Sequence, residues 1–233
     1  MVKKVISINS IGSSNFSCFC VNHTSNNVPA IIIVSDNLKI DNWIKTTANK
    51  WAKLGYLTIT PDLSHNVVSR FVTETKTKTH SRNNRYSTQN TDYDSAIRDI
   101  NSIILEIKTF SNYNGNIGII GFSSGATLAY LSAARLNVDV VVGYYGSEIL
   151  EYLNEGKNIT CPLLLHMTTH DNTIEEHSLK RIQAALIGKG NISIYTYDAR
   201  HGFANTDNPK LYLPEKARLA QDRTYKVLAA LYD

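Results

Sequence analysis

The chain has 233 residues, of which 42% are hydrophobic and 19% charged, and its formal net charge is +4 at pH 7. These are the values of an ordinary globular protein, and they fit one domain over residues 1–233 better than two. The basic residues are too few and too scattered to indicate nucleic-acid binding, and no apolar run is long enough for a membrane span or a signal sequence. We therefore expect a soluble, cytoplasmic protein.

Short buried strands alternate with amphipathic helices along most of the chain. Strands are predicted over Lys4–Ile8, Ser17–Val21, Ala30–Val34, Tyr56–Thr60, Asn116–Ile120, Val138–Tyr144, Leu163–Met167 and Ser193–Tyr197. Helices are predicted over Asp41–Leu54, Ser95–Phe110, Ala126–Ala134, Ile174–Leu186 and Pro214–Leu231. This alternation predicts an α/β fold with a mainly parallel central sheet and helices on both faces. The polar stretch 64–90 shows no clear period, and we expect it to form a long excursion on the surface.

The pentapeptide Gly121-Phe122-Ser123-Ser124-Gly125 has the pattern G-x-S-x-G. It lies between a predicted strand and a predicted helix, and this context is typical of a nucleophile elbow. A tight turn there exposes the central side chain, and the flanking glycines leave room where a Cβ would clash. Ser123 is therefore the candidate nucleophile, and the alternative is an ordinary turn serine.

Asp171 and His201 each follow a predicted strand farther along the chain. In α/β sheets the chemistry gathers at the carboxyl ends of the strands, and the order Ser, Asp, His is typical of α/β-hydrolases. Histidine can remove the proton of a serine because its pKa lies near 7, and a buried carboxylate fixes the imidazole tautomer. Asp171 and His201 are thus candidate catalytic residues beside Ser123, with Asp198 competing for the role of the acid.

His166 and His170 stand four residues apart, next to Asp171, which raises the question of a metal site. His166 falls within a predicted strand, however, so the spacing that places two histidines on one face of a helix does not apply. We therefore predict neither a metal nor a cofactor.

A tetrahedral oxyanion needs two backbone N–H groups aimed at the developing charge. One is expected from Ser124, at the start of the predicted helix, where the helix dipole adds positive potential. The other is expected from the turn Ser35-Asp36-Asn37, which follows the strand Ala30–Val34, and Asn37 is the candidate.

Five further motifs follow one another in the chain. They are Gly55-Tyr56 through Pro61-Asp62-Leu63, Ile117 to Phe122, Val142 to Gly146, Leu165-His166-Met167 before Asp171, and Tyr197 through His201-Gly202-Phe203-Ala204. In these motifs, which cover about residues 28–233, the chain resembles the dienelactone hydrolase (carboxymethylenebutenolidase) family. The resemblance implies a small α/β-hydrolase fold without a separate cap domain, hydrolysis of enol-lactone or ester bonds, and a monomer.

Two positions depart from the best-known members of that family. The elbow carries Ser123 where they carry cysteine, and the early turn carries Asp36 where they carry glutamate. A thiol is acidic enough to be held by that carboxylate but a hydroxyl is not, so Ser123 should rely on His201 as its base. Asp36 is then expected to line the substrate pocket. The sequence leaves open whether Ser123 replaces a native cysteine.

In that family, arginines hold the carboxylate of the substrate. Arg82 and Arg85 lie in the comparable excursion, so the resemblance implies that they bind substrate; the alternative is a solvated loop. After His201, Asn205 stands where an arginine is expected, and a neutral amide cannot form the bidentate contact of a guanidinium. Dienelactone itself is therefore disfavoured as the substrate.

The residues together predict a hydrolase of a small ester or lactone that acts through Ser123, His201 and Asp171 and forms an acyl-enzyme. Two alternatives stay open. One is a general carboxylesterase or thioesterase without a preference for lactones, and the other is a catalytically silent member of the fold that binds a ligand or a partner protein.

Overall fold

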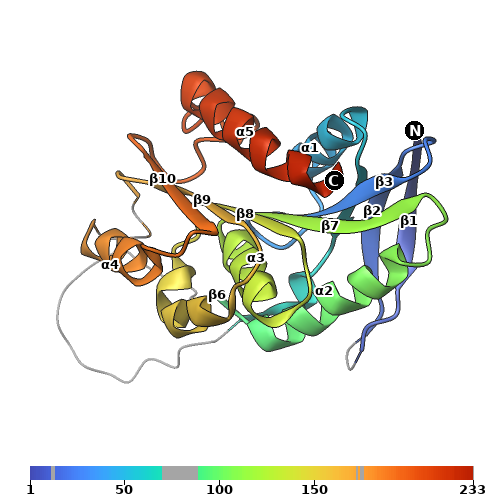
Figure 1. Cartoon of the computed structure of the whole chain (residues 1–233), viewed down its shortest axis with the longest axis horizontal. Helices are drawn as coiled ribbons and strands as arrows, with labels where there is room; N and C mark the ends of the chain where they lie inside the picture. Colours follow the sequence, from blue (N-terminus) through green and yellow to red (C-terminus); the bar gives the residue numbers. More distant parts are fainter. Residues whose placement is uncertain (12–13, 70–88, 172, 174–175, 233) are drawn as a thin grey trace.

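The computed structural model describes residues 1–11, 14–69, 89–171, 173 and 176–232. An eight-stranded sheet forms its centre, with the strand order β1-β2-β4-β3-β7-β8-β9-β10 (Figure 1). These strands are β1 Val2–Ile8, β2 Phe16–Asn22, β3 Val28–Val34, β4 Leu57–Pro61, β7 Tyr113–Phe122, β8 Val140–Tyr144, β9 Leu163–Thr168 and β10 Ile192–Tyr197. Neighbouring strands pair in parallel, except that β2 is antiparallel to both β1 and β4. The predicted mainly parallel sheet is confirmed.

Helices cover both faces of this sheet, as predicted. The α-helices are α1 Asn42–Lys53, α2 Tyr93–Ile107, α3 Ser124–Arg135, α4 Glu176–Leu186 and α5 Pro214–Leu228, and the 3-10 segments are η1 Ser64–Asn66, η2 Glu148–Asn158 and η3 Ala229–Tyr232. Helices α1 and α5 pack on one face, and α2, α3 and α4 pack on the other (Figure 1). Among the described residues, no helix is long and apolar enough to cross a membrane.

The central strands β3 and β7 mark the point where the strand order reverses. From β3 the chain adds β4 on one side, and it then returns through α2 to place β7 on the other side of β3. Ligands of such sheets bind outside the carboxyl ends of the strands at this reversal. The turn after β3, which holds Asp36 and Asn37, and the turn after β7, which holds Ser123, therefore meet at the edge where a ligand is expected.

The local sequence explains why these elements form. Every residue of β3 is buried, in keeping with a β-branched strand that is covered on both faces. Asp41 caps α1 by accepting a hydrogen bond from the N–H of Ile44 at 2.8 Å, and Asp92 caps α2 through the N–H of Ser95 at 3.0 Å. Because Asp92 is the cap, α2 begins at Tyr93, ahead of the predicted start at Ser95.

Three differences from the predicted elements are local. Strand β7 extends beyond Asn116–Ile120 at both ends, because it pairs with β3 and β8 over that length. Segment η2 has no predicted counterpart; it kinks at Tyr152 and is anchored by the fully buried Ile149. The two ends of the excursion, here called its roots, are the strands β5 Val67–Ser69 and β6 Gln89–Thr91, which form an antiparallel pair. Residues 70–88 lie outside the described residues.

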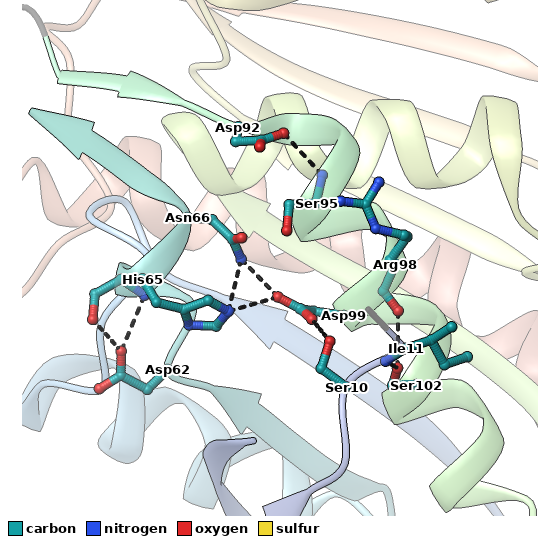
Figure 2. A network of polar contacts seen from close by, with 11 residues as sticks. Ser10, Ile11, Asp62, His65, Asn66, Asp92, Ser95, Arg98, Asp99 and Ser102 are labelled. Carbon is teal, nitrogen blue, oxygen red and sulfur yellow. Dashed lines mark hydrogen bonds and ion pairs between the residues drawn. The ribbon is translucent and has the colours of Figure 1, made fainter. Parts of the chain in front are cut away.

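Asp99 on α2 is fully buried and gathers a polar network at the roots of this excursion (Figure 2). Its Oδ2 accepts from Asn66 Nδ2 at 2.7 Å and from His65 Nε2 at 2.8 Å, and the Ser10 hydroxyl donates to its Oδ1. The N–H of Asp92 donates to the carbonyl oxygen of Asn66 at 2.8 Å, so the two ends of the excursion are tied together. A buried carboxylate with several donors is costly to disturb, which makes this network an anchor for both ends.

Candidate active site

Ser123 occupies the turn between β7 and α3 in a conformation that few non-glycine residues adopt. Its φ is 52° and its ψ is −118°. The turn requires both glycines of the pentapeptide, because a Cβ on Gly121 would lie 1.9 Å from the carbonyl oxygen of Gly125, and one on Gly125 would lie 2.6 Å from that of Ser35. Such strain is found at functional sites where the surrounding structure holds it in place. The predicted tight turn between a strand and a helix is therefore present, with Ser123 at its centre.

His201 bridges Ser123 and Asp171. Its Nε2 lies 2.8 Å from Ser123 Oγ, and its Nδ1 lies 2.9 Å from Asp171 Oδ2. The three side chains come from the turns after β7, β9 and β10, which are close together because the strands are parallel and share one edge. This is the connectivity in which a carboxylate orients an imidazole and the imidazole takes the proton of a hydroxyl.

The side chain of Asp171 is 1% exposed and is held from several directions. Thr168 Oγ1 donates to Oδ2 at 2.6 Å, while the N–H and Oγ1 of Thr173 donate to Oδ1 at 2.8 Å and 2.5 Å. Burial raises the pKa of this carboxyl, but the hydrogen bonds from His201, Thr168 and Thr173 outweigh burial and bring the pKa to about 2. No sequence pattern pointed to Thr168 or Thr173 beyond their proximity to Asp171.

Asp198, the competing candidate for the acid, lies elsewhere. It pairs with His170, Nε2 to Oδ1 at 2.8 Å, and both side chains are largely exposed at 68% and 78%. The pair lines a cavity of about 710 Å³ on the Asp171 side of the edge, which neither Ser123 nor His201 lines. The choice of Asp171 over Asp198 therefore agrees with the geometry.

His166 is fully buried, and each of its two ring nitrogens lies beside a hydroxyl group. Its Nδ1 lies 2.8 Å from Tyr197 Oη and its Nε2 lies 3.0 Å from Thr224 Oγ1, while Arg223 donates to Tyr197 Oη at 2.9 Å. Burial, helped by the nearby charge of Arg223, lowers the pKa of His166 to about 3. Within the described ranges, no group of three histidine, cysteine or acidic side chains could hold a metal ion.

The turn after β3 places Asp36 and Asn37 beside the same edge. Asn37 Oδ1 accepts from the N–H of Lys39 at 3.0 Å, which fixes the turn, and Asp36 Oδ1 is buried with no hydrogen-bond partner. Burial raises the pKa of Asp36, as does the charge of Asp41, while the Asn37 N–H and His201 oppose the rise. The N–H predicted for the oxyanion hole thus faces a carboxyl group.

Ser124, the other predicted oxyanion donor, is the first residue of α3. The hydroxyl of Tyr93, at the start of α2, lies 3.4 Å from the carbonyl oxygen of Ser124 and donates to Glu148 of η2. Three elements therefore meet at the start of α3, and nothing in the sequence linked Tyr93 or Glu148 to the elbow.

Tyr145 is a further neighbour that the sequence did not single out as a site residue. It is 2% exposed, has a φ of 45°, and places its ring centroid 4.8 Å from that of His201. Burial raises its pKa well above the usual value, and the charges of Asp36 and Asp171 add to the rise. Tyr145 is therefore a neutral, packed wall beside the imidazole.

The predicted substrate-binding arginines, Arg82 and Arg85, lie outside the described residues. Asn205, at the position where an arginine is expected, accepts a hydrogen bond from the N–H of Asp207 at 2.9 Å, while its own N–H donates to the carbonyl oxygen of Gly202. This side chain stabilises a turn, which is a common use of asparagine.

Comparisons with known proteins agree with this architecture. The sequence profile of the dienelactone hydrolase family matches residues 16–232. Carboxymethylenebutenolidase 1 of Cupriavidus pinatubonensis is 23% identical over 233 residues, which cover 100% of this chain and 99% of that protein. Carboxymethylenebutenolidase of Pseudomonas knackmussii is 25% identical over 232 residues, covering 99% and 98%.

A solved structure from Klebsiella pneumoniae, assigned as a dienelactone hydrolase, has a TM-score of 0.79 at 18% identity and covers 98% of this chain and 99% of that one. At this identity the likeness concerns the fold, which is that of the α/β-hydrolases without a separate cap. Because the family match spans almost the whole chain, this protein belongs to the dienelactone hydrolase family and is a carboxylic ester hydrolase.

Proposed function

We propose that this protein hydrolyses a small ester or lactone through Ser123, His201 and Asp171. The observation that carries the proposal is the continuous hydrogen-bonded row from Ser123 Oγ through His201 to Asp171, at 2.8 Å and 2.9 Å. Spacings of this kind allow a proton to pass from a nucleophile to a base.

The reaction follows from these contacts. His201 Nε2 takes the proton of Ser123 as Oγ attacks the carbonyl carbon, and the carbonyl oxygen becomes an oxyanion. The bond to the leaving oxygen then breaks, His201 gives it the proton, and the acyl group stays on Ser123. In a second round His201 takes a proton from water as the water oxygen attacks the acyl carbon. The bond between this carbon and Ser123 Oγ then breaks, His201 returns the proton to Oγ, and the acid leaves. Asp171 stays ionised throughout and stabilises the imidazolium.

The oxyanion is assigned to the N–H groups of Ser124 and Asn37. Ser124 begins α3, where unpaired N–H groups and the helix dipole favour negative charge. The N–H of Asn37 faces the carboxyl of Asp36, so the oxyanion and this carboxyl compete for one donor.

For the substrate we favour a small ester or lactone other than dienelactone itself. The relatives are named carboxymethylenebutenolidases, which supports lactones as a class. The position where an arginine is expected after His201 holds Asn205, whose side chain is engaged in a turn. We keep the role of substrate binding for Arg82 and Arg85 in the excursion. Asp36 is proposed to line the substrate pocket. We also propose a monomer in the cytoplasm, which size-exclusion chromatography and fractionation of the source cells would test.

The test compares p-nitrophenyl acetate hydrolysis by the parent chain and by its Ser123→Ala and Ser123→Cys variants. We expect activity in the parent and a loss in the Ala variant. An Ala variant that keeps full activity on every ester cleaved by the parent would overturn the proposal. A silent parent with an active Cys variant would instead indicate that the thiol is the native nucleophile.

A substrate pair separates a lactonase from a general esterase. Dihydrocoumarin and phenyl propionate carry the same acyl and phenol groups, one as a ring and one as an open ester, so a lactonase should prefer the first. A fluorophosphonate probe addresses the silent alternative, because a fold member without a working nucleophile would not be labelled.

A further inference from the structure

A second cavity, separate from the row formed by Ser123, His201 and Asp171, lies between α1 and α5. Its volume is about 420 Å³, and its floor is formed by the face of β7 and β8 that α1 and α5 cover. Residues of both helices and of the segment after His201 complete its lining, but Ser123, Asp171 and His201 do not belong to it. The volume falls within the range of about 300–1,000 Å³ in which small-molecule sites are found.

The floor of this cavity is aromatic. Phe122 and Tyr144 are register partners on β7 and β8, with ring centroids 4.8 Å apart and planes tilted by 29°. Trp43 of α1 packs its ring edge-on to Phe122 at 4.7 Å. Each of these three rings is only 4–5% exposed, so a flat aromatic ligand would contact the small part of them that faces the cavity, and such contacts add to the hydrophobic contribution.

The helices add positive charge. Lys50 of α1 and Arg218 of α5 both line the cavity, and no acidic side chain is among its lining residues. Lys50 Nζ donates to the neutral amide of Gln221 at 2.6 Å, so its charge is not neutralised there. Arg218 reaches Asp222 at 3.4 Å, but both side chains are exposed, at 78% and 56%, and such a pair is weak.

We propose that this cavity binds an aromatic monocarboxylate, with its ring on Phe122, Tyr144 and Trp43 and its carboxylate toward Lys50 and Arg218. A single aromatic ring on a short carboxylate chain matches both the apolar floor and the two cations. Phe122 directly precedes Ser123, so an occupant would contact the strand that carries the nucleophile. This inference does not rest on the proposed function, because it concerns binding rather than hydrolysis.

The two tryptophans of the chain provide the readout. Trp43 and Trp51 both line this cavity, so intrinsic tryptophan fluorescence reports on it directly. In Ser123→Ala protein, we expect 3-phenylpropionate to change this fluorescence saturably, with a Kd of about 1 mM or below for a ligand of this size. The matched amide, 3-phenylpropanamide, should bind about tenfold more weakly because it lacks the charge.

Variants locate the binding. Lys50→Gln combined with Arg218→Gln should weaken 3-phenylpropionate about tenfold. Lys53→Gln combined with Lys226→Gln removes the same charge from exposed positions of the same helices that do not line the cavity, and it should bind as the parent does. Ala217→Phe fills the cavity and should abolish binding, with circular dichroism confirming that it folds.

Isothermal titration of wild-type protein labelled at Ser123 with phenylmethanesulfonyl fluoride separates this cavity from the catalytic edge. Binding that survives labelling supports the proposal. The proposal is overturned by no saturable binding, by binding that labelling removes, or by equal affinity in the two double variants. If phenylmethanesulfonyl fluoride does not label Ser123, the proposed hydrolase mechanism is in question. The affinities of the two double variants still decide whether this cavity binds the carboxylate.

Discussion

Two clusters in this molecule contain a serine, a histidine and an aspartate, but their hydrogen bonds connect these residues in different orders. At the sheet edge, His201 lies in the middle, with Ser123 on Nε2 and Asp171 on Nδ1. At the roots of the excursion, Asp99 lies in the middle and accepts from both His65 and Ser10. The same residue types thus form a row centred on a histidine in one place and a network centred on an aspartate in the other.

The difference lies in the connectivity of the hydrogen bonds rather than in the composition of the clusters. A hydroxyl that donates to an imidazole nitrogen has a base to take its proton, whereas one that donates to a buried carboxylate completes the solvation of that charge. Ser123 also stands in a strained turn at the carboxyl ends of parallel strands, while Ser10 lies beyond the end of β1 against α2. We therefore expect chemistry from the first cluster and stability from the second.

The largest expected effect separates the two serines. Ser123→Ala should lower kcat/KM for p-nitrophenyl acetate by about 10⁴- to 10⁶-fold, because the nucleophile is lost. Ser10→Ala should change kcat/KM less than about twofold, because the Ser10 hydroxyl donates to Asp99 rather than to His201. Steady-state kinetics of both variants, corrected for folded fraction, provide the test. Comparable losses in the two variants would remove the distinction between the clusters.

The two aspartates should separate activity from stability. Asp171→Asn should reduce kcat about 10⁴-fold, since an amide no longer fixes the reactive imidazole tautomer. Asp99→Asn should lower the free energy of unfolding by about 2–4 kcal/mol, because an amide cannot accept from all the donors around it.

Kinetics and urea unfolding on each aspartate variant check this pair. Full stability in Asp99→Asn, or a loss of kcat in its folded fraction as large as that of Asp171→Asn, would contradict the assignment.

A third histidine, His166, extends the comparison to the pH dependence of the free energy of unfolding. The pKa of buried His166 is lowered to about 3, from an ordinary value of 6.5, so its neutral form stabilises the fold. That contribution is complete above about pH 6.5 and is lost as the pH falls toward 3, by up to about 1.4 kcal/mol per pH unit. We expect the free energy of unfolding of the parent to fall more steeply than that of His166→Gln between pH 6.5 and 4. Parallel curves would show that His166 is not held neutral.

The smallest expected effect contrasts two carboxyls near His201. The pKa of Asp171 is lowered to about 2, whereas burial raises that of Asp36. Ionised Asp36 therefore weakens the fold, and this penalty disappears as the pH falls through its folded pKa. Asp36→Ala should raise the free energy of unfolding at pH 7 by about 1 kcal/mol, because a buried oxygen without a partner is removed.

Thermal unfolding of Asp36→Ala at pH 7 and pH 4 is the measurement. The stabilisation should shrink at the lower pH, and an equal gain at both values would remove its link to the charge.

Much of the site followed from local patterns. The G-x-S-x-G motif between a strand and a helix identified Ser123, and parallel-sheet geometry explains why Asp171 and His201, each just past a strand, lie near it. The supporting contacts of Thr168 and Thr173 did not follow, because they depend on how the turn after β9 closes around a carboxylate. Segment η2 was not predicted, because its packing against the core, rather than its helix propensity, holds it in place.

The sequence by itself determined the order of strands and helices, the family and the identity of the three candidate catalytic residues, because each is encoded in a short run of neighbouring residues. Only the tertiary structure decided which aspartate faces His201, that Tyr145 packs on its ring, and that Ser10, His65 and Asp99 form a network across 89 residues. Contacts at such separations depend on the exact packing of strands and helices, for which a single sequence carries no local pattern.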